Sequence, residues 1–249
     1  MHPRTLCLAA IAALATTAAA HADLLLDFQT DALGQPIRAG QVIDDEYQPW
    51  GVNITADTHR GSDVVITFDS ANPTGNDTDL VTPGYGSGNT EPLGNMLIMP
   101  KDIVDADHDG YVDDPDDHAT GRPGSVVFTF DRTYEAGSLT FIDIEESGGK
   151  IFFARSDGAG GWSPSGQLPI PTFGDNSVQT IDFAGVALFD RMTVELRGSG
   201  AMDSLRVTGG GVVIPEPASV ALFACGGLLM APSRWRRVGR GRQQLKLEP

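Results

Sequence analysis

Short apolar runs separated by turn residues constrain the fold of this chain more than any other feature. Ten runs of four to seven residues alternate in polarity or are rich in β-branched residues, which is typical of strands. They lie at 24–28, 51–56, 64–68, 96–99, 125–130, 138–144, 150–154, 178–183, 191–196 and 204–207. Segments rich in Gly, Asn, Asp and Pro, such as 156–165, are predicted to be loops between them. Residues 23–208 are therefore predicted to form one all-β domain, a single jelly-roll-like β-sandwich.

The central part of the chain is strongly acidic. The net charge is −16, and residues 23–233 alone carry about −22, because they hold ten basic and 32 acidic side chains. Such a surface repels phosphate backbones, so we expect no nucleic-acid partner and regard calcium or glycans as more suitable ligands. The two cysteines, Cys7 and Cys225, lie in apolar terminal segments. A disulfide, a catalytic thiol and a cysteine zinc site are thereby excluded from residues 23–208.

The first 22 residues have the features of a secretory signal peptide. Arg4 supplies a positive charge, residues 6–20 are apolar, and residues 20–22 form an A-x-A cleavage site. We expect the mature protein to begin at Asp23 and to be exported.

The C-terminal end has three parts in a fixed order. A Gly-rich linker at 209–217 ends in Pro215, Glu216 and Pro217, an uncharged apolar segment follows at 218–233, and a basic tail occupies 234–249. As a helix, residues 218–231 of this segment would span roughly 21 Å of a hydrocarbon core about 30 Å thick. The arginines and the tryptophan that follow can extend such a span into the interface. We therefore expect a short transmembrane segment with a cytoplasmic tail.

This arrangement resembles the PEP-CTERM sorting signal of Gram-negative bacteria, with Pro215, Glu216 and Pro217 as the sorting motif. The resemblance implies an exosortase, a membrane transpeptidase, as a partner during export. It also implies transient anchoring in the inner membrane and delivery to the cell surface or the extracellular matrix. Residues 243–249 extend past the point where such tails usually end. An ordinary single-span membrane anchor is the alternative.

The central part of the chain is also similar to the all-β domains that commonly precede PEP-CTERM tails. These domains open with a short strand followed by acidic residues, as at 24–28, and close with a segment like that at 199–205. The resemblance implies a jelly roll whose first and last strands are tied together by calcium. Asp27 and Asp203 are the candidate ligands of this second metal site, and two unrelated surface carboxylates are the alternative.

The sharpest chemical signal is an acidic loop at 105–116. Its spacing reproduces that of an EF-hand loop, in which alternate residues of a tight turn point oxygens at one calcium ion. The candidate ligands are the carboxylates of Asp105, Asp107, Asp109, Asp113 and Asp116 and the backbone carbonyl of Tyr111. Asp116 replaces the usual glutamate, and Pro115 disfavours an exiting helix, so the loop is closer to the helix-free loops of dockerin-like repeats. Calcium is the expected cofactor, and a solvated acidic turn is the alternative.

Several other residues are weaker candidates for a ligand site. Asp77 and Asp79 lie in a long polar loop, and Glu145 and Glu146 follow a predicted strand as a potential glycosidase-type pair. Three aromatic residues beside Gly or Pro could stack on sugar rings, and packing in the core or in a loop is the alternative. They are Trp50, Tyr85 and Trp162.

No motif for nucleophilic, zinc-dependent or phosphate-transfer catalysis occurs in the sequence. We therefore expect a surface or matrix protein that acts by structure or binding and is not an enzyme. A carbohydrate-binding module for exopolysaccharide is the first alternative, indicated by exposed aromatics aligned on one face of the sandwich. A secreted glycan hydrolase or lyase is the second, and it would require two carboxylates in a groove.

Overall fold

The computed structural model of the chain describes residues 23–58, 63–75, 77–117 and 123–209. All of them belong to one unit of the chain, Met1–Gly211, and the second unit, Val212–Pro249, lies outside the described residues. The predicted signal peptide, sorting motif, transmembrane segment and basic tail lie outside them as well. Within the described ranges, no helix is long and apolar enough to cross a membrane.

The regular structure of the described residues is almost entirely β. The strands are β1 (Leu24–Leu26), β2 (Val52–Asp57), β3 (Ile66–Asp69), β4 (Asn95–Ile98), β5 (Gly124–Tyr134), β6 (Ala136–Ile142), β7 (Gly149–Ser156), β8 (Trp162–Ile170), β9 (Val178–Asp182), β10 (Phe189–Leu196) and β11 (Ala201–Thr208). Two 3-10 helices of three residues each, η1 (Gln48–Trp50) and η2 (Thr78–Leu80), are the only helices in this part of the chain. The predicted all-β class is confirmed.

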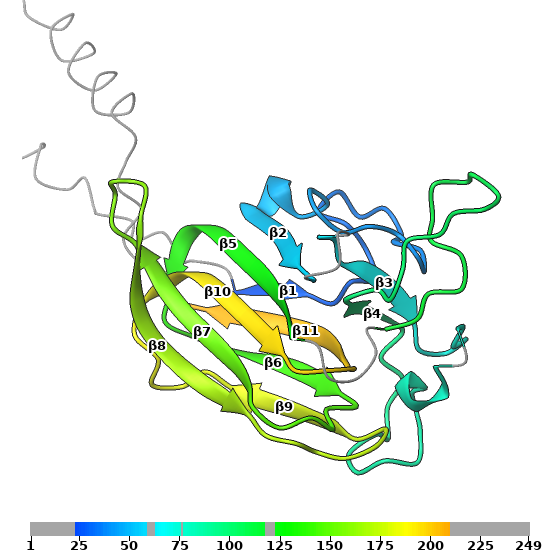
Figure 1. Cartoon of the computed structure of the whole chain (residues 1–249). Helices are drawn as coiled ribbons and strands as arrows, with labels where there is room; N and C mark the ends of the chain where they lie inside the picture. Colours follow the sequence, from blue (N-terminus) through cyan, green and yellow to red (C-terminus); the bar gives the residue numbers. More distant parts are fainter. Residues whose placement is uncertain (1–22, 59–62, 76, 118–122, 210–249) are drawn as a thin grey trace, which may run out of the picture. The chain divides into compact units, whose positions relative to one another are not determined.

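The strands form two antiparallel sheets (Figure 1). A six-stranded sheet has the order β3-β4-β11-β6-β9, and β1 also pairs with β11. A five-stranded sheet has the order β2-β5-β10-β7-β8. The chain crosses repeatedly between the sheets, as from β4 to β5, β5 to β6 and β6 to β7. The first and last strands are neighbours, because Leu24 pairs with Val207 and Leu26 pairs with Leu205.

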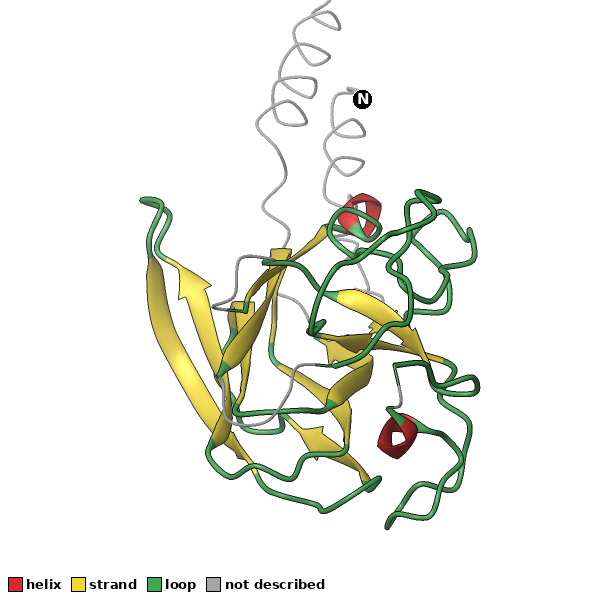
Figure 2. Ribbon diagram, turned by 45° about the vertical axis from the view of Figure 1, so that its right-hand side comes forward, coloured by secondary structure: helices red, strands yellow, loops and turns green. Residues whose placement is uncertain are grey.

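Side-chain alternation assigns one face of each sheet to the core. In β5, Val126 and Phe128 are fully buried, and the residues between and beside them are only half-buried. The core contains a cluster of aromatic rings, with centroids 4.9 Å apart for Phe153 and Phe189 and 5.1 Å apart for Phe153 and Phe183. Phe183 directly follows β9 of the six-stranded sheet, whereas Phe153 belongs to the five-stranded sheet. The cluster therefore joins the two layers. Figure 2 shows these layers with the long loops gathered to one side of them.

The structure corrects the sequence prediction at two strands. Residues 156–165 were expected to be a loop, but β8 begins at Trp162 and pairs with β7 along its whole length. Pro164 and Pro169 lie in this strand, which is possible because β8 is at the edge of its sheet, where one side of the backbone needs no partner. β1 is shorter than predicted, because Phe28 has a positive φ of 56° and turns the chain away.

Candidate functional site

The outward face of the five-stranded sheet is built from three rows of side chains that cross all five strands. Direct cross-strand partners share a face, so the register of the ladders gives each row. The first row is Asn53, Thr129, Arg191, Ala154 and Pro164, the second is Thr55, Val127, Thr193, Phe152 and Gln167, and the third is Asp57, Ser125, Glu195, Lys150 and Pro169. The face is therefore mainly polar, and its aromatic side chains are concentrated at β7 and β8.

Phe152 and Trp162 line a hollow of about 570 Å³ on this side of the sheet. Trp162 is 39% exposed, although it is a large apolar side chain. The guanidinium carbon of Arg191 lies 5.0 Å from the centroid of the Trp162 ring, and Lys150 Nζ lies 5.9 Å from that of Phe152. Each cation thus covers part of an aromatic face. We name the hollow the aromatic groove. Its lining residues are Phe152, Phe153, Ala154, Trp162, Pro164, Gly166 and Gln167.

The other two aromatic candidates lie elsewhere. Trp50 ends η1 and packs on Tyr47 with ring centroids 5.8 Å apart, beside a separate hollow of about 350 Å³. The Tyr85 hydroxyl donates a hydrogen bond of 2.7 Å to Asp175 Oδ1. Of the three residues named from the sequence, Trp162 alone belongs to the sheet face. Phe152 was not predicted as a site residue. The alternation of polarity in its strand predicts that its side chain points outward, but it does not predict that β8 is the neighbouring strand.

Carboxylates of the acidic loop at 105–116 accept hydrogen bonds from the loop's own backbone N–H groups. Asp105 accepts hydrogen bonds from the N–H groups of Asp109 at 3.2 Å and Gly110 at 3.1 Å. Asp113 accepts one from the N–H of Ala106 at 2.7 Å. Asp105, Asp107 and Asp113 each place one oxygen within 4.8 Å of the others. Three of the five predicted carboxylate ligands therefore come together.

Asp109 and Asp116 are placed differently. Asp109 Oδ1 accepts a hydrogen bond from the N–H of Tyr111 at 3.0 Å and is not part of that group of three. Asp116 forms an ion pair with Lys101, with Nζ and Oδ2 2.7 Å apart. It belongs to a different acidic group, with Asp77 and Asp117, and not to the group that contains Asp105.

The pairing of β1 with β11 brings Asp27 close to Asp203. Asp203 is 3% exposed, and its Oδ2 accepts a hydrogen bond from the Ser204 hydroxyl at 3.1 Å. Its Oδ1 is buried and has no hydrogen-bond partner in the described part of the chain. Burial raises the pKa of Asp203 to about 7 against the hydrogen bonds from Ser204, and the negative charge of Asp27 adds to the rise. The unpartnered oxygen of Asp203 and the nearby charge of Asp27 make Asp203 a suitable ligand for a cation.

Asp77 and Asp79 lie in a larger acidic region beside the six-stranded sheet. This region contains two groups of three carboxylates, and within each group the oxygens lie within 4.8 Å of one another. Burial, and then a hydrogen bond with Asp79, raise the pKa of Asp77 to about 9. Burial also raises the pKa values of Asp117 and Asp143 to about 7. The first group is Asp77, Asp116 and Asp117, and the second is Asp79, Asp143 and Asp175.

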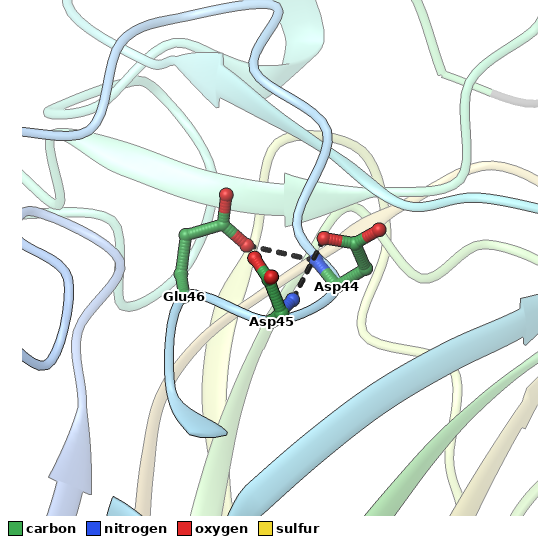
Figure 3. A group of neighbouring side chains, drawn as sticks. All are labelled: Asp44, Asp45 and Glu46. Atoms are coloured by element: carbon green, nitrogen blue, oxygen red, sulfur yellow. Dashed lines mark hydrogen bonds between the residues drawn. The ribbon is translucent and has the colours of Figure 1, made fainter. Parts of the chain in front are cut away.

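Two further acidic segments lie at 44–46 and 145–146. Asp44 accepts a hydrogen bond from the N–H of Asp45 at 2.7 Å, and Glu46 accepts one from the N–H of Asp44 at 2.8 Å (Figure 3). These bonds fold the turn before η1. The carboxylate of Glu146 lies against Gly198, whereas Glu145 is exposed. Neither glutamate lines the aromatic groove.

No protein-family model matches the chain, and no curated protein matches it. Similar solved structures include a family 11 carbohydrate-binding module from Clostridium thermocellum, with 11% identity, a TM-score of 0.33, and coverage of 68% of this chain and 95% of that one. An F5/8 type C domain from Bacteroides fragilis has 8% identity, a TM-score of 0.31, and coverage of 67% and 95%.

The C-terminal domain of a chitobiase from Bacteroides fragilis has 15% identity, a TM-score of 0.23 and coverage of 36% of this chain. The chain spans 65% of the length of that domain, and 66% of a similar structure from Clostridium perfringens.

Proposed function

We propose that this protein binds carbohydrate in the aromatic groove and carries out no reaction on it. The observation that carries the proposal is the position of Trp162 and Phe152, which line one hollow on the outward face of the five-stranded sheet. Sugar rings have an apolar C–H face that can lie against an aromatic ring, and hydroxyls that need polar partners. The polar rows of the same sheet supply those partners at Thr193 and Gln167.

The lining of the groove favours binding over hydrolysis. A glycosidase of the common type needs two carboxyl groups on opposite sides of the scissile bond. The residues that line the aromatic groove include no Asp, Glu, His or Cys. A sugar bound there would meet apolar surfaces, backbone groups and the Gln167 amide, which hold a ring in place without activating water.

The test is a glycan array followed by calorimetric titration, using the full chain and two tryptophan variants. Trp162→Ala should reduce affinity for the best glycan at least tenfold, because removing a central aromatic anchor commonly costs about 1–2 kcal/mol or more. Trp50→Ala is the matched control, since Trp50 is 37% exposed and lies outside the aromatic groove. Equal binding by both variants, or equal loss in both, would overturn the proposal.

We further propose that the protein is exported, sorted by an exosortase and displayed at the surface or in the extracellular matrix. The support is the ordered tail, in which Pro215, Glu216 and Pro217 precede an apolar segment and an arginine cluster. In an exosortase-deficient host, the protein should remain in the inner membrane, as shown by fractionation. Equal surface release from wild-type and deficient hosts would contradict this.

A calcium-stabilised jelly roll is the fold that we propose for this exported domain. The loop at 105–116 is supported by the approach of Asp105, Asp107 and Asp113, and the second site by the unsatisfied oxygen of Asp203 close to Asp27. Calcium at the second site would tie β1 to β11, the first and last strands.

A further inference from the structure

We propose that Asp79, Asp143 and Asp175 bind a calcium ion at one end of the six-stranded sheet, at a site separate from the loop at 105–116. Asp77 and Asp117 lie next to this site, because Asp77 forms a hydrogen bond with Asp79, and Asp117 interacts electrostatically with Asp79 and Asp143. The inference does not depend on carbohydrate binding.

The sheet brings these residues together from distant parts of the sequence. Ile98, Ala201, Ile142 and Val178 form a single row across β4, β11, β6 and β9. It is the last row of the sheet at this end. Asp143 directly follows β6, and Asp175 lies three residues before β9. They are therefore carried to the same sheet end by paired strands.

Two loops complete the region around this row. Asp117 lies beside this row because two contacts hold it there. It forms an isolated β-bridge with Pro100, just beyond β4, and its Oδ2 accepts a hydrogen bond from the N–H of Gly200, just before β11. Asp79 is supplied by η2. The Asn176 side chain holds η2 in place, because its Nδ2 donates hydrogen bonds to the carbonyl oxygens of Asp79 at 2.6 Å and Val81 at 2.9 Å.

An unsatisfied oxygen in the cluster points to a cation ligand. Asp79 Oδ1 is buried and has no hydrogen-bond partner within the described residues. Asp143 is 1% exposed, and its Oδ1 accepts a hydrogen bond from the N–H of Asn176 at 2.7 Å. Oxygens of both residues lie within 4.8 Å of each other and of Asp175. Buried carboxylate oxygens without partners are rare, because their loss of hydration is not repaid.

The three proposed ligands have no protein cation as a partner. Among the described residues, no Lys, Arg or His forms an ion pair with Asp79, Asp143 or Asp175, and Lys101 pairs with Asp116. A divalent cation would replace the missing hydration of these oxygens and offset the repulsion between them. Calcium suits the site because it accepts hard oxygen ligands in irregular geometry and retains water, which can enter beside the exposed Asp175.

Two tyrosines allow this site to be distinguished from the loop by terbium luminescence. Terbium occupies calcium sites and emits when a nearby aromatic ring transfers energy to it. Tyr85 donates its hydroxyl hydrogen bond to Asp175, whereas Tyr111 belongs to the acidic loop. With the full chain carrying Asp105→Asn and Asp109→Asn, sensitised emission should persist. It should fall at least threefold when Tyr85→Phe is added, and Tyr111→Phe should leave it unchanged. Emission that depends on Tyr111 and not on Tyr85 would overturn the proposal.

Calcium titration of the same double-variant chain provides the second measurement. Adding Asp79→Asn should weaken calcium binding at this site at least tenfold and abolish the rise in melting temperature that this site produces. In chelator, Asp79→Asn should leave the melting temperature equal or higher, because it removes one charge from a crowded cluster. Asp175→Asn tests an exposed ligand whose substitution does not disturb the core, and Asp102→Asn is the control. Unchanged calcium binding in both ligand variants, or a melting temperature lowered equally with and without calcium, would overturn the proposal.

Discussion

Buried carboxylates are the residues whose behaviour departs most from that of ordinary surface side chains in this protein. Asp117, Asp143 and Asp203 are each more than nine-tenths buried, and burial raises their pKa values to about 7. None of them is neutralised by an ion pair with another described residue. At neutral pH, each carboxylate therefore has to be protonated, bound to a cation, or held as a charge that destabilises the fold.

We expect the protein in chelator to be more stable at about pH 6 than at about pH 8. The ordinary pKa of an aspartate is 3.8, so between 3.8 and about 7 the folded state binds more protons than the unfolded state. Stability is then fully present below the unfolded pKa and is lost as the pH rises through the folded pKa. Urea unfolding across this range measures the effect, and Asp203→Asn should reduce the slope. A flat profile would contradict the assignment of raised pKa values.

Calcium binding by the loop at 105–116 is tested by removing the charges of two of its carboxylates. Asp105→Asn combined with Asp109→Asn should remove one calcium ion from the calorimetric stoichiometry, because Asp105 joins the group of three and Asp109 is the predicted ligand at the fifth position of the loop. In the parent protein, the dissociation constant of this loop for calcium should be on the order of 10⁻⁴ M, which is in the weaker extracellular range. Asp102→Asn, just before the loop, serves as the control. If the double variant binds as many ions as the parent, the loop is a solvated acidic turn.

At the scale of elements, the sequence predicts strands well where one face is buried. Alternation in β5 and β10 follows from an apolar inner face, and both strands were expected at nearly the observed positions. The strand β8 was not predicted, because this edge strand has few buried residues and contains Pro164, Gly166 and Pro169. The acidic loop was visible as a local spacing. The aromatic groove was predicted only at Trp162, and the groups of buried carboxylates only at Asp77 and Asp79. Their other members depend on which strands become neighbours.

The prolines of β8 are expected to prevent edge-to-edge association. Replacing Pro164 and Pro169 with Thr and Val would supply backbone N–H groups on an exposed strand edge, which can pair with another chain. The double variant should show a higher weight-average mass by light scattering at equal concentration. Pro171→Val, just beyond the strand, is the control. A double variant that scatters no more than this control would show that the edge is protected in another way.

At the scale of the whole molecule, the aromatic cluster couples the two sheets. Phe189 contacts both Phe153 and Phe183, with ring centroids 4.9 Å and 6.5 Å away. Phe189→Ala should lower the free energy of unfolding by about 3–5 kcal/mol, because the cavity that it leaves lies between rigid layers. Chemical denaturation measures the loss, and Trp162→Ala should change stability far less. A loss below about 1 kcal/mol for Phe189→Ala would show that the layers close around the cavity.

The position of β11 also determines how the domain would respond to mechanical load. Force transmitted along the chain beyond Thr208 would reach the domain through this strand, which is central in its sheet: β6 lines one edge, and β4 and β1 share the other. Extracting it requires the hydrogen bonds to three strands to break. A domain tethered at that end would therefore resist unfolding under shear flow better than a domain whose last strand lay at a sheet edge.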